Sequence, residues 1–147
     1  MNKGDLFIII PSRIGSTRLK NKPLVDLKGK TLIQRVVANA LKITENVYVA
    51  TDSVLIEESL KELTNNVVIT SSEHISGTDR VYEAAKKLNL NENTFILNLQ
   101  GDEPFIPEEL IKKTIEDYLN NSCDVITVSN NIYSDLDISN PNCVLVE

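Results

Sequence analysis

Short apolar runs alternate along the chain with segments in which apolar residues recur every three or four positions. The first run, at residues 7–10, has four apolar residues in succession and indicates a strand covered on both faces, as in a parallel sheet. Other strand-like runs lie at residues 47–50, 67–70, 94–99 and 124–128, and segments with helical spacing lie at residues 32–41, 55–63, 78–88 and 107–119. This alternation predicts an α/β fold with a mainly parallel, doubly wound sheet.

The first strand leads into a loop with concentrated positive charge. Residues 12–30 contain six Lys or Arg residues and one carboxylate, although the whole chain has a formal net charge of −6 at pH 7. Because α/β proteins bind ligands beyond the carboxyl ends of their strands, we interpret this loop as an anion site rather than an ordinary solvated loop. Its candidate binding residues are the hydroxyl donors Ser12, Ser16 and Thr17 and the cations Arg13, Arg18 and Lys22.

Two later segments follow strands of the same expected sheet. Ser76-Gly77-Thr78 stands at a helix start, where free backbone N–H groups and hydroxyls can meet a polar ligand; an ordinary helix cap is the alternative. Asp102 follows a strand in a Gly-containing turn, where its carboxylate suits Mg²⁺, and simple turn chemistry is its alternative. His74 is the only histidine, and a loop-orienting role is favoured over a catalytic base.

Several classes of protein are disfavoured. Gly29-Lys30-Thr31 lacks the earlier glycine of a P-loop, and no Gly-x-Gly-x-x-Gly fingerprint occurs. A net charge of −6 and 5% aromatic residues argue against nucleic-acid binding. With no signal-peptide pattern and no apolar run of membrane-spanning length, we expect a cytoplasmic protein without membrane contact, in which Cys123 and Cys143 are reduced structural thiols.

The length of 147 residues and the hydrophobic content of 41% suit one globular domain. A strand-like run starts at residue 143 and stops at residue 147. Since a domain seldom ends within a strand, we expect the chain to be a shortened form of a longer protein.

Four segments together carry a family resemblance. Residues 10–24 (IPSRIGSTRLKNKPL), 50–52 (ATD), 74–80 (HISGTDR) and 98–107 (NLQGDEPFIP) resemble the 3-deoxy-manno-octulosonate cytidylyltransferases, or CMP-Kdo synthetases. The opening loop is shared with other sugar cytidylyltransferases, including spore-coat types, whereas the two later blocks are more specific.

The resemblance implies a Rossmann-like, three-layer nucleotidyltransferase, with residues 1–147 as the N-terminal nucleotide-binding part of one domain. It implies transfer of CMP from CTP to Kdo, with release of pyrophosphate, for lipopolysaccharide synthesis. Arg13, Arg18 and Lys22 would hold the triphosphate, with the hydroxyls of Ser16 and Thr17 nearby; Pro11, Ser12 and residues 76–80, which include Ser76, Gly77, Thr78 and Arg80, would recognise cytidine. Gln100 would face nucleotide and sugar, Asp102 would bind Mg²⁺, and the catalytic set would be Arg13, Lys22 and Asp102.

Two departures from the family pattern affect these expectations. Lys20-Asn21 replaces the usual Pro-Gly, and asparagine tolerates the backbone angles that such a turn requires. The family chain continues beyond position 147, and that part carries further sugar contacts, a second metal carboxylate and much of the homodimer interface. The open alternatives are an inactive CTP-binding fragment and a cytidylyltransferase for another acidic or spore-coat sugar.

Overall fold

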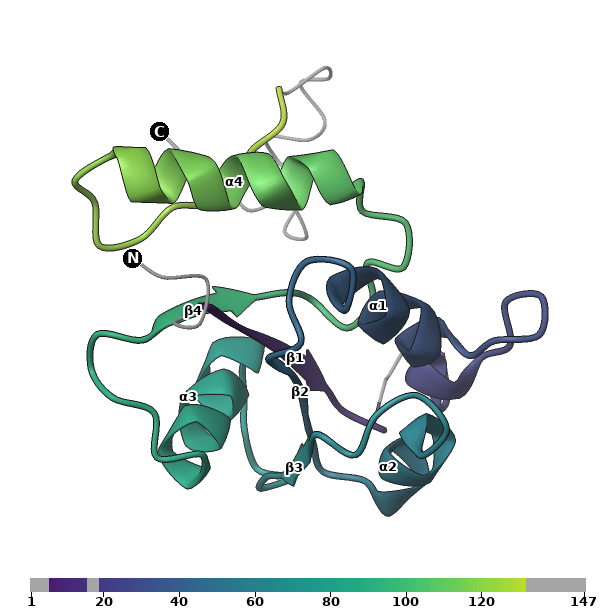
Figure 1. Cartoon of the computed structure of the whole chain (residues 1–147). Helices are drawn as coiled ribbons and strands as arrows, with labels where there is room; N and C mark the ends of the chain where they lie inside the picture. The colour runs from purple at the N-terminus through teal and green to yellow at the C-terminus, as the bar shows by residue number, and fades with distance from the viewer. Residues whose placement is uncertain (1–5, 16–18, 132–147) are drawn as a thin grey trace. The chain divides into compact units, whose positions relative to one another are not determined.

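The computed structural model describes residues 6–15 and 19–131, and these form two compact units, Met1–Glu109 and Leu110–Glu147. The first unit holds a sheet of parallel strands in the order β3-β2-β1-β4, with helices packed against it (Figure 1). The elements in chain order are β1 (Leu6–Ser12), the 3-10 helix η2 (Lys22–Leu24), α1 (Leu32–Ala40), β2 (Val47–Thr51), α2 (Val54–Leu60), β3 (Val67–Ile69), α3 (Gly77–Lys87), β4 (Phe95–Asn98) and α4 (Glu108–Asn120). The predicted parallel α/β fold is confirmed.

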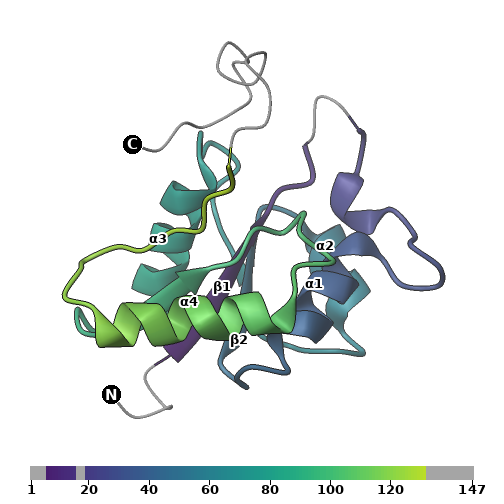
Figure 2. The same cartoon turned by 90° about the horizontal axis from the view of Figure 1, so that it is seen from above.

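Helices cover both faces of the sheet, which gives the first unit three layers. Figure 2 shows α3 on one side of β1 and β2, and α1 with α2 on the other side. Val81 and Ala84 of α3 form a buried cluster with Ile9, Ala50 and Val68 of three strands. The side chains at residues 8–10 have no exposed surface, as expected for a strand covered on both faces.

Local signals in the sequence explain where the helices begin. Thr31 caps α1 by accepting from the backbone N–H of Gln34, whose side chain accepts in turn from the N–H of Thr31. Ser53 caps α2 by accepting from the backbone N–H of Leu55, and Ser76 caps α3 by accepting from the backbone N–H of Asp79. Ser53 comes two residues after the end of β2, whereas Ser76 comes seven residues after the end of β3.

The predicted fifth strand at residues 124–128 is wrong. This segment has no helical or strand structure, and the side chains of Val125 and Val128 are 82% and 50% exposed. A short apolar run becomes a strand only when it pairs with a neighbour, and nothing in the run itself encodes that pairing. Cys123 nearby is an exposed free thiol, whereas Cys143 lies outside the described residues.

None of the helices in the described part of the chain is long and apolar enough to cross a membrane.

Candidate functional site

A pocket lies where the carboxyl ends of β1 and β4 meet the N-terminus of α3. Its volume is about 270 Å³, close to the lower end of the usual range for small-molecule sites, about 300–1,000 Å³. Most of the residues that the sequence predicts for a ligand site line this pocket: Pro11, Ser12, Arg13, Lys22, Ser76, Gly77, Arg80, Gln100 and Asp102. The parallel order of β1 and β4 therefore brings together segments that are about ninety positions apart, as the α/β topology predicts.

Some predicted site residues are not among those that line the pocket. Thr78 is the second residue of α3, and its side chain is exposed outside the pocket. Ser16, Thr17 and Arg18 lie outside the described residues, so their roles stay predictions.

The pocket floor depends on close backbone packing at two glycines. A Cβ atom added to Gly101 would lie 2.6 Å from the carbonyl oxygen of Pro11 and 3.3 Å from the Cβ of Ser12. A Cβ atom added to Gly77 would lie 3.2 Å from Cγ of Pro11. The turn at Gly101 therefore approaches the end of β1 more closely than a residue with a side chain would allow, whereas a side chain at Gly77 would require only a small shift of Pro11.

Replacing Gly101 with alanine should consequently destabilise the first unit by about 1–3 kcal/mol, because backbone must move to admit the methyl group. Urea unfolding followed by circular dichroism measures this loss. Gly15→Ala is the matched control, since a Cβ at Gly15 would have no atom within 4 Å among the described residues other than its chain neighbours. Equal stability of the two variants would show that Gly101 is not needed for close packing.

Ser12 presents a polar atom with no partner in the described structure. Its Oγ atom is buried and makes no hydrogen bond to any described residue, although the side chain lines the pocket. Buried hydroxyl groups normally have a partner, and leaving one without costs about 1–3 kcal/mol. The hydroxyl is thus available to a polar group of a ligand.

The cationic side of the pocket is formed by Arg13 and Lys22. Arg13 is exposed, whereas Lys22 begins η2 and its Nζ atom lies 2.6 Å from Oδ2 of Asp102. Asn21, which precedes η2, has φ 53° and ψ 35°, so the expectation that asparagine supports the unusual turn is confirmed. The predicted phosphate-binding lysine and the predicted metal carboxylate therefore meet directly.

Asp102 fits Mg²⁺ as a single ligand. Its side chain is 50% exposed and borders the pocket, yet the described residues contain no group of three or more potential metal-ligating side chains. Mg²⁺ is commonly bound by one or two carboxylates and completes its octahedron with phosphate oxygens and water. The donor set present is therefore suited to a metal that arrives with a phosphate ligand, not to a closed protein cage.

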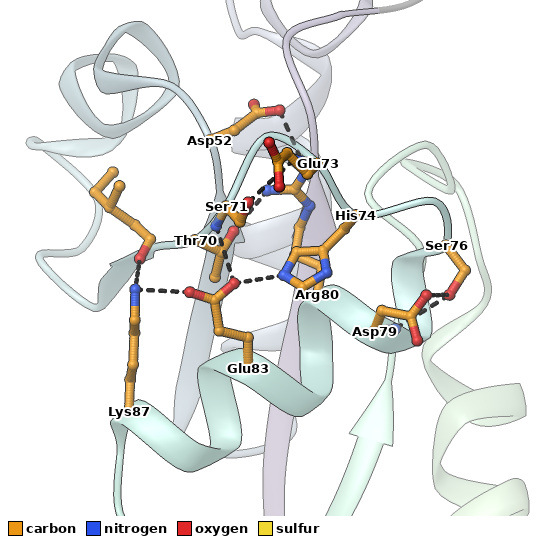
Figure 3. Close-up of polar contacts among 11 residues, drawn as sticks. Asp52, Thr70, Ser71, Glu73, His74, Ser76, Asp79, Arg80, Glu83 and Lys87 are labelled. Carbon is orange, nitrogen blue, oxygen red and sulfur yellow. Dashed lines mark hydrogen bonds and ion pairs between the residues drawn. The ribbon is translucent and has the colours of Figure 1, made fainter.

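Arg80 is anchored inside the protein, although it also lines the pocket. Its Nη1 atom donates to Oγ1 of Thr70 at 2.6 Å, and its Nη2 atom lies 3.2 Å from Oδ2 of Asp52 (Figure 3). The other carboxylate oxygen of Asp52 accepts from the backbone N–H of Ile14 at 3.0 Å. Arg80 is 3% exposed. Its guanidinium links Thr70, which follows β3, to Asp52, which follows β2, and Asp52 in turn binds the cationic loop at Ile14.

A second polar cluster supports the loop between β3 and α3. The Nε2 atom of His74 contacts Oε2 of Glu83, which agrees with a loop-orienting role for this histidine. The pKa of Glu83 is lowered to about 2 by the Lys87 ammonium first, then by the Ser71 N–H and His74. The hydroxyl of Ser76 accepts from the backbone N–H of Asp79 and donates to the Asp79 carboxylate. The Ser76 hydroxyl therefore acts as a helix cap.

The sequence reasoning did not assign site roles to Asp52 and Glu83. Asp52 belongs to the family motif at residues 50–52, and Glu83 lies on a helix where a carboxylate four residues before Lys87 is typical of an exposed ion pair. Nothing in their spacing indicates the loop contacts that they make.

Comparisons with known proteins show the family to which the chain belongs. A family described as cytidylyltransferase matches residues 7–146. The chain is 47% identical to the 3-deoxy-manno-octulosonate cytidylyltransferase of Lawsonia intracellularis over 126 residues, which is 84% of this chain and 50% of that protein. It is 43% identical to the enzyme of the same name from Idiomarina loihiensis, over 95% of this chain and 56% of that protein.

Among solved structures, the chain is similar to a CMP:2-keto-3-deoxy-manno-octonic acid synthetase complexed with CTP. The TM-score is 0.71 and the sequence identity is 36%, over 79% of this chain and 48% of that chain. It thus spans about half the length of the curated relatives that it matches. The family resemblance seen in the motifs is confirmed.

Proposed function

Because this chain belongs to the cytidylyltransferase family, we propose that its pocket binds CTP and that the protein transfers CMP from CTP to Kdo. One observation carries the proposal. Two cations, a buried hydroxyl that has no partner among residues 6–15 and 19–131, and the N-terminus of α3 converge on one pocket at the carboxyl ends of β1 and β4. These are the groups that a phosphorylated, polar ligand requires.

Different residues of the pocket would bind the triphosphate and the nucleoside of CTP. Arg13 and Lys22 would bind and orient the triphosphate and offset its negative charge. Ser12 and Gln100, which also line the pocket, would donate to or accept from the nucleoside together with the backbone at Ser76 and Gly77.

In the transfer itself, a hydroxyl oxygen of Kdo forms a bond to the α-phosphorus of CTP and gives up its proton to solvent, while the bond to pyrophosphate breaks and pyrophosphate leaves with the bonding electron pair. No protein nucleophile is required. The task of the protein is to hold the two substrates in line and to stabilise charge on the phosphates, which are electrostatic and positioning effects.

We further propose Mg²⁺ as the cofactor, held by Asp102 together with phosphate oxygens of the bound nucleotide. When bound, the metal neutralises phosphate charge and orients the phosphates. Lys22 lies against Asp102 in the described structure, so its ammonium is near both the carboxylate and any phosphate bound there.

Replacing Asp102 with asparagine should therefore remove the effect of Mg²⁺ on CTP binding. Calorimetric titration of CTP with and without Mg²⁺ should show tighter binding with Mg²⁺ for the natural chain and equal affinities for the variant. Glu103→Gln is the control, because Glu103 is the neighbouring exposed carboxylate and does not line the pocket. Mg²⁺ dependence that persists in the Asp102 variant would contradict the metal role.

Pyrophosphate release from CTP in the presence of Mg²⁺ and Kdo tests the transfer reaction. Turnover with Kdo supports the proposal, and turnover only with another acidic sugar would change the substrate. Selective CTP binding without turnover would favour the alternative of an inactive CTP-binding chain. A cytoplasmic homodimer acting in lipopolysaccharide synthesis stays a prediction from the family resemblance, and analytical ultracentrifugation tests the dimer.

A further inference from the structure

Glu83 connects α3 to the loop that precedes it. Its Oε2 atom accepts from the backbone N–H of Ser71 at 2.9 Å and also contacts Nε2 of His74 (Figure 3). Its Oε1 atom lies 2.8 Å from Nζ of Lys87, one helical turn further along α3. A solvent-exposed ion pair within a helix would make only the contact with Lys87. Glu83 therefore has a further role, because it also binds the loop at Ser71 and His74.

The neighbouring charged residues of α3 hold the same segment from the same side. Nζ of Lys87 donates to the carbonyl oxygen of Ile69 at 2.7 Å, and Arg80 donates to the hydroxyl of Thr70. Residues 80, 83 and 87 share one helix face because they are three and four positions apart. The end of β3 and the start of the following loop are thus attached to α3 at consecutive points.

This loop continues directly into the wall of the pocket. His74, Ser76 and Gly77 all line the pocket, whereas the side chains of Ser71 and Glu73 are exposed and lie outside its lining. The contact between Glu83 and His74 is therefore one point at which α3 holds the part of the loop that lines the pocket, and the bonds between Ser76 and Asp79 at the helix start are another. The three partners of Glu83 stabilise its charged form and lower its pKa to about 2, with Lys87 the largest cause, so the carboxylate accepts from them throughout the neutral pH range.

We propose that Glu83 is a positioning residue for nucleotide binding: by holding Ser71 and His74, it sets the position of the loop residues His74 and Ile75, which line the pocket ahead of the helix cap. The inference rests on the proposed CTP site, since it assigns a role within that site to a residue that does not line it. Glu83 acts on affinity through the loop and makes no contact with the nucleotide.

The test compares Glu83→Ala with Glu83→Gln and with a matched control, Glu58→Ala. Glu58 also forms a carboxylate–lysine pair within a helix, 2.9 Å from Lys61, but contacts no loop of the pocket. Glu83→Ala should weaken CTP binding about tenfold in calorimetry, in line with the effects of supporting residues elsewhere. Glu83→Gln, which keeps one acceptor oxygen, should recover part of this loss, and Glu58→Ala should bind CTP like the natural chain.

Backbone amide exchange provides a readout that does not require ligand. Exchange at residues 71–77 should become faster in Glu83→Ala and stay unchanged in Glu58→Ala, and His74→Ala should add little to Glu83→Ala because the two residues act together. Unchanged exchange and unchanged CTP affinity in Glu83→Ala would overturn the proposal.

The two proposals fail in different ways. If the natural chain binds no CTP, the proposed function fails, and faster exchange in Glu83→Ala still supports loop positioning while unchanged exchange refutes it. If the natural chain binds CTP and Glu83→Ala binds it equally well, the positioning role fails and the proposed function stands. Should Glu83→Ala not fold, Glu83→Gln decides the matter with the same two measurements.

Discussion

Replacing Arg80 with methionine should lower the free energy of unfolding by about 3–5 kcal/mol, because it leaves a buried carboxylate without its partner. Asp52 is only 9% exposed at its side chain, and Arg80 is 3% exposed, so water cannot readily replace the lost guanidinium. The variant also frees the hydroxyl of Thr70, to which Arg80 donates at 2.6 Å. Urea unfolding measures the loss.

Two further variants separate the buried charge from other effects. Asp52→Asn combined with Arg80→Met should recover part of the lost stability, because no unpaired charge then remains buried. Lys61→Met breaks an exposed pair and should cost less than about 1 kcal/mol. A loss for Arg80→Met as small as that for Lys61→Met would contradict the role of Arg80 as an internal anchor.

Replacing Lys22 with methionine should weaken CTP binding by about tenfold to a hundredfold. A charge-assisted hydrogen bond is worth about 1.5–3 kcal/mol, and each 1.4 kcal/mol is a factor of ten in affinity. The variant also leaves Asp102 without the cation that lies 2.6 Å from it, so this carboxylate would repel the phosphates in the absence of Mg²⁺. Calorimetric titration with CTP measures the change.

Lys20→Met is the matched control for this experiment. It removes the same charge from the same loop, but Lys20 is exposed and does not line the pocket. Its effect on CTP affinity should be small and should disappear at high salt, because only long-range attraction is lost. Equal losses in the two variants would mean that the loop acts through its overall charge, without a specific position for Lys22.

The sequence allowed much of the fold to be predicted because burial leaves a periodic pattern. The continuous apolar run of β1 and the three- and four-residue spacing of α1 and α3 each appear at the expected place. The segment at residues 124–128 has the same apolar character and is not a strand, because pairing depends on a partner elsewhere in the chain.

The same distinction applies to the site. The meeting of Arg13, Lys22 and Asp102 was predictable because parallel strands place their carboxyl ends at one edge. The supporting contacts of Asp52 with Arg80 and of His74 with Glu83 were not, since each joins residues at separations that no local pattern specifies. Arg80 lines the pocket and its guanidinium is held by Thr70 and Asp52, so its predicted part in nucleotide recognition stays a prediction.

Calorimetric titration of the natural chain with CTP, compared with ATP and GTP under the same Mg²⁺ concentration, tests the central claim most directly. The expected result is saturable binding of CTP at one site per chain, with much weaker binding of the two purine nucleotides and with affinity reduced in Lys22→Met. Absence of CTP binding, or equal affinity for all three nucleotides, would contradict the assignment of this pocket as a CTP site.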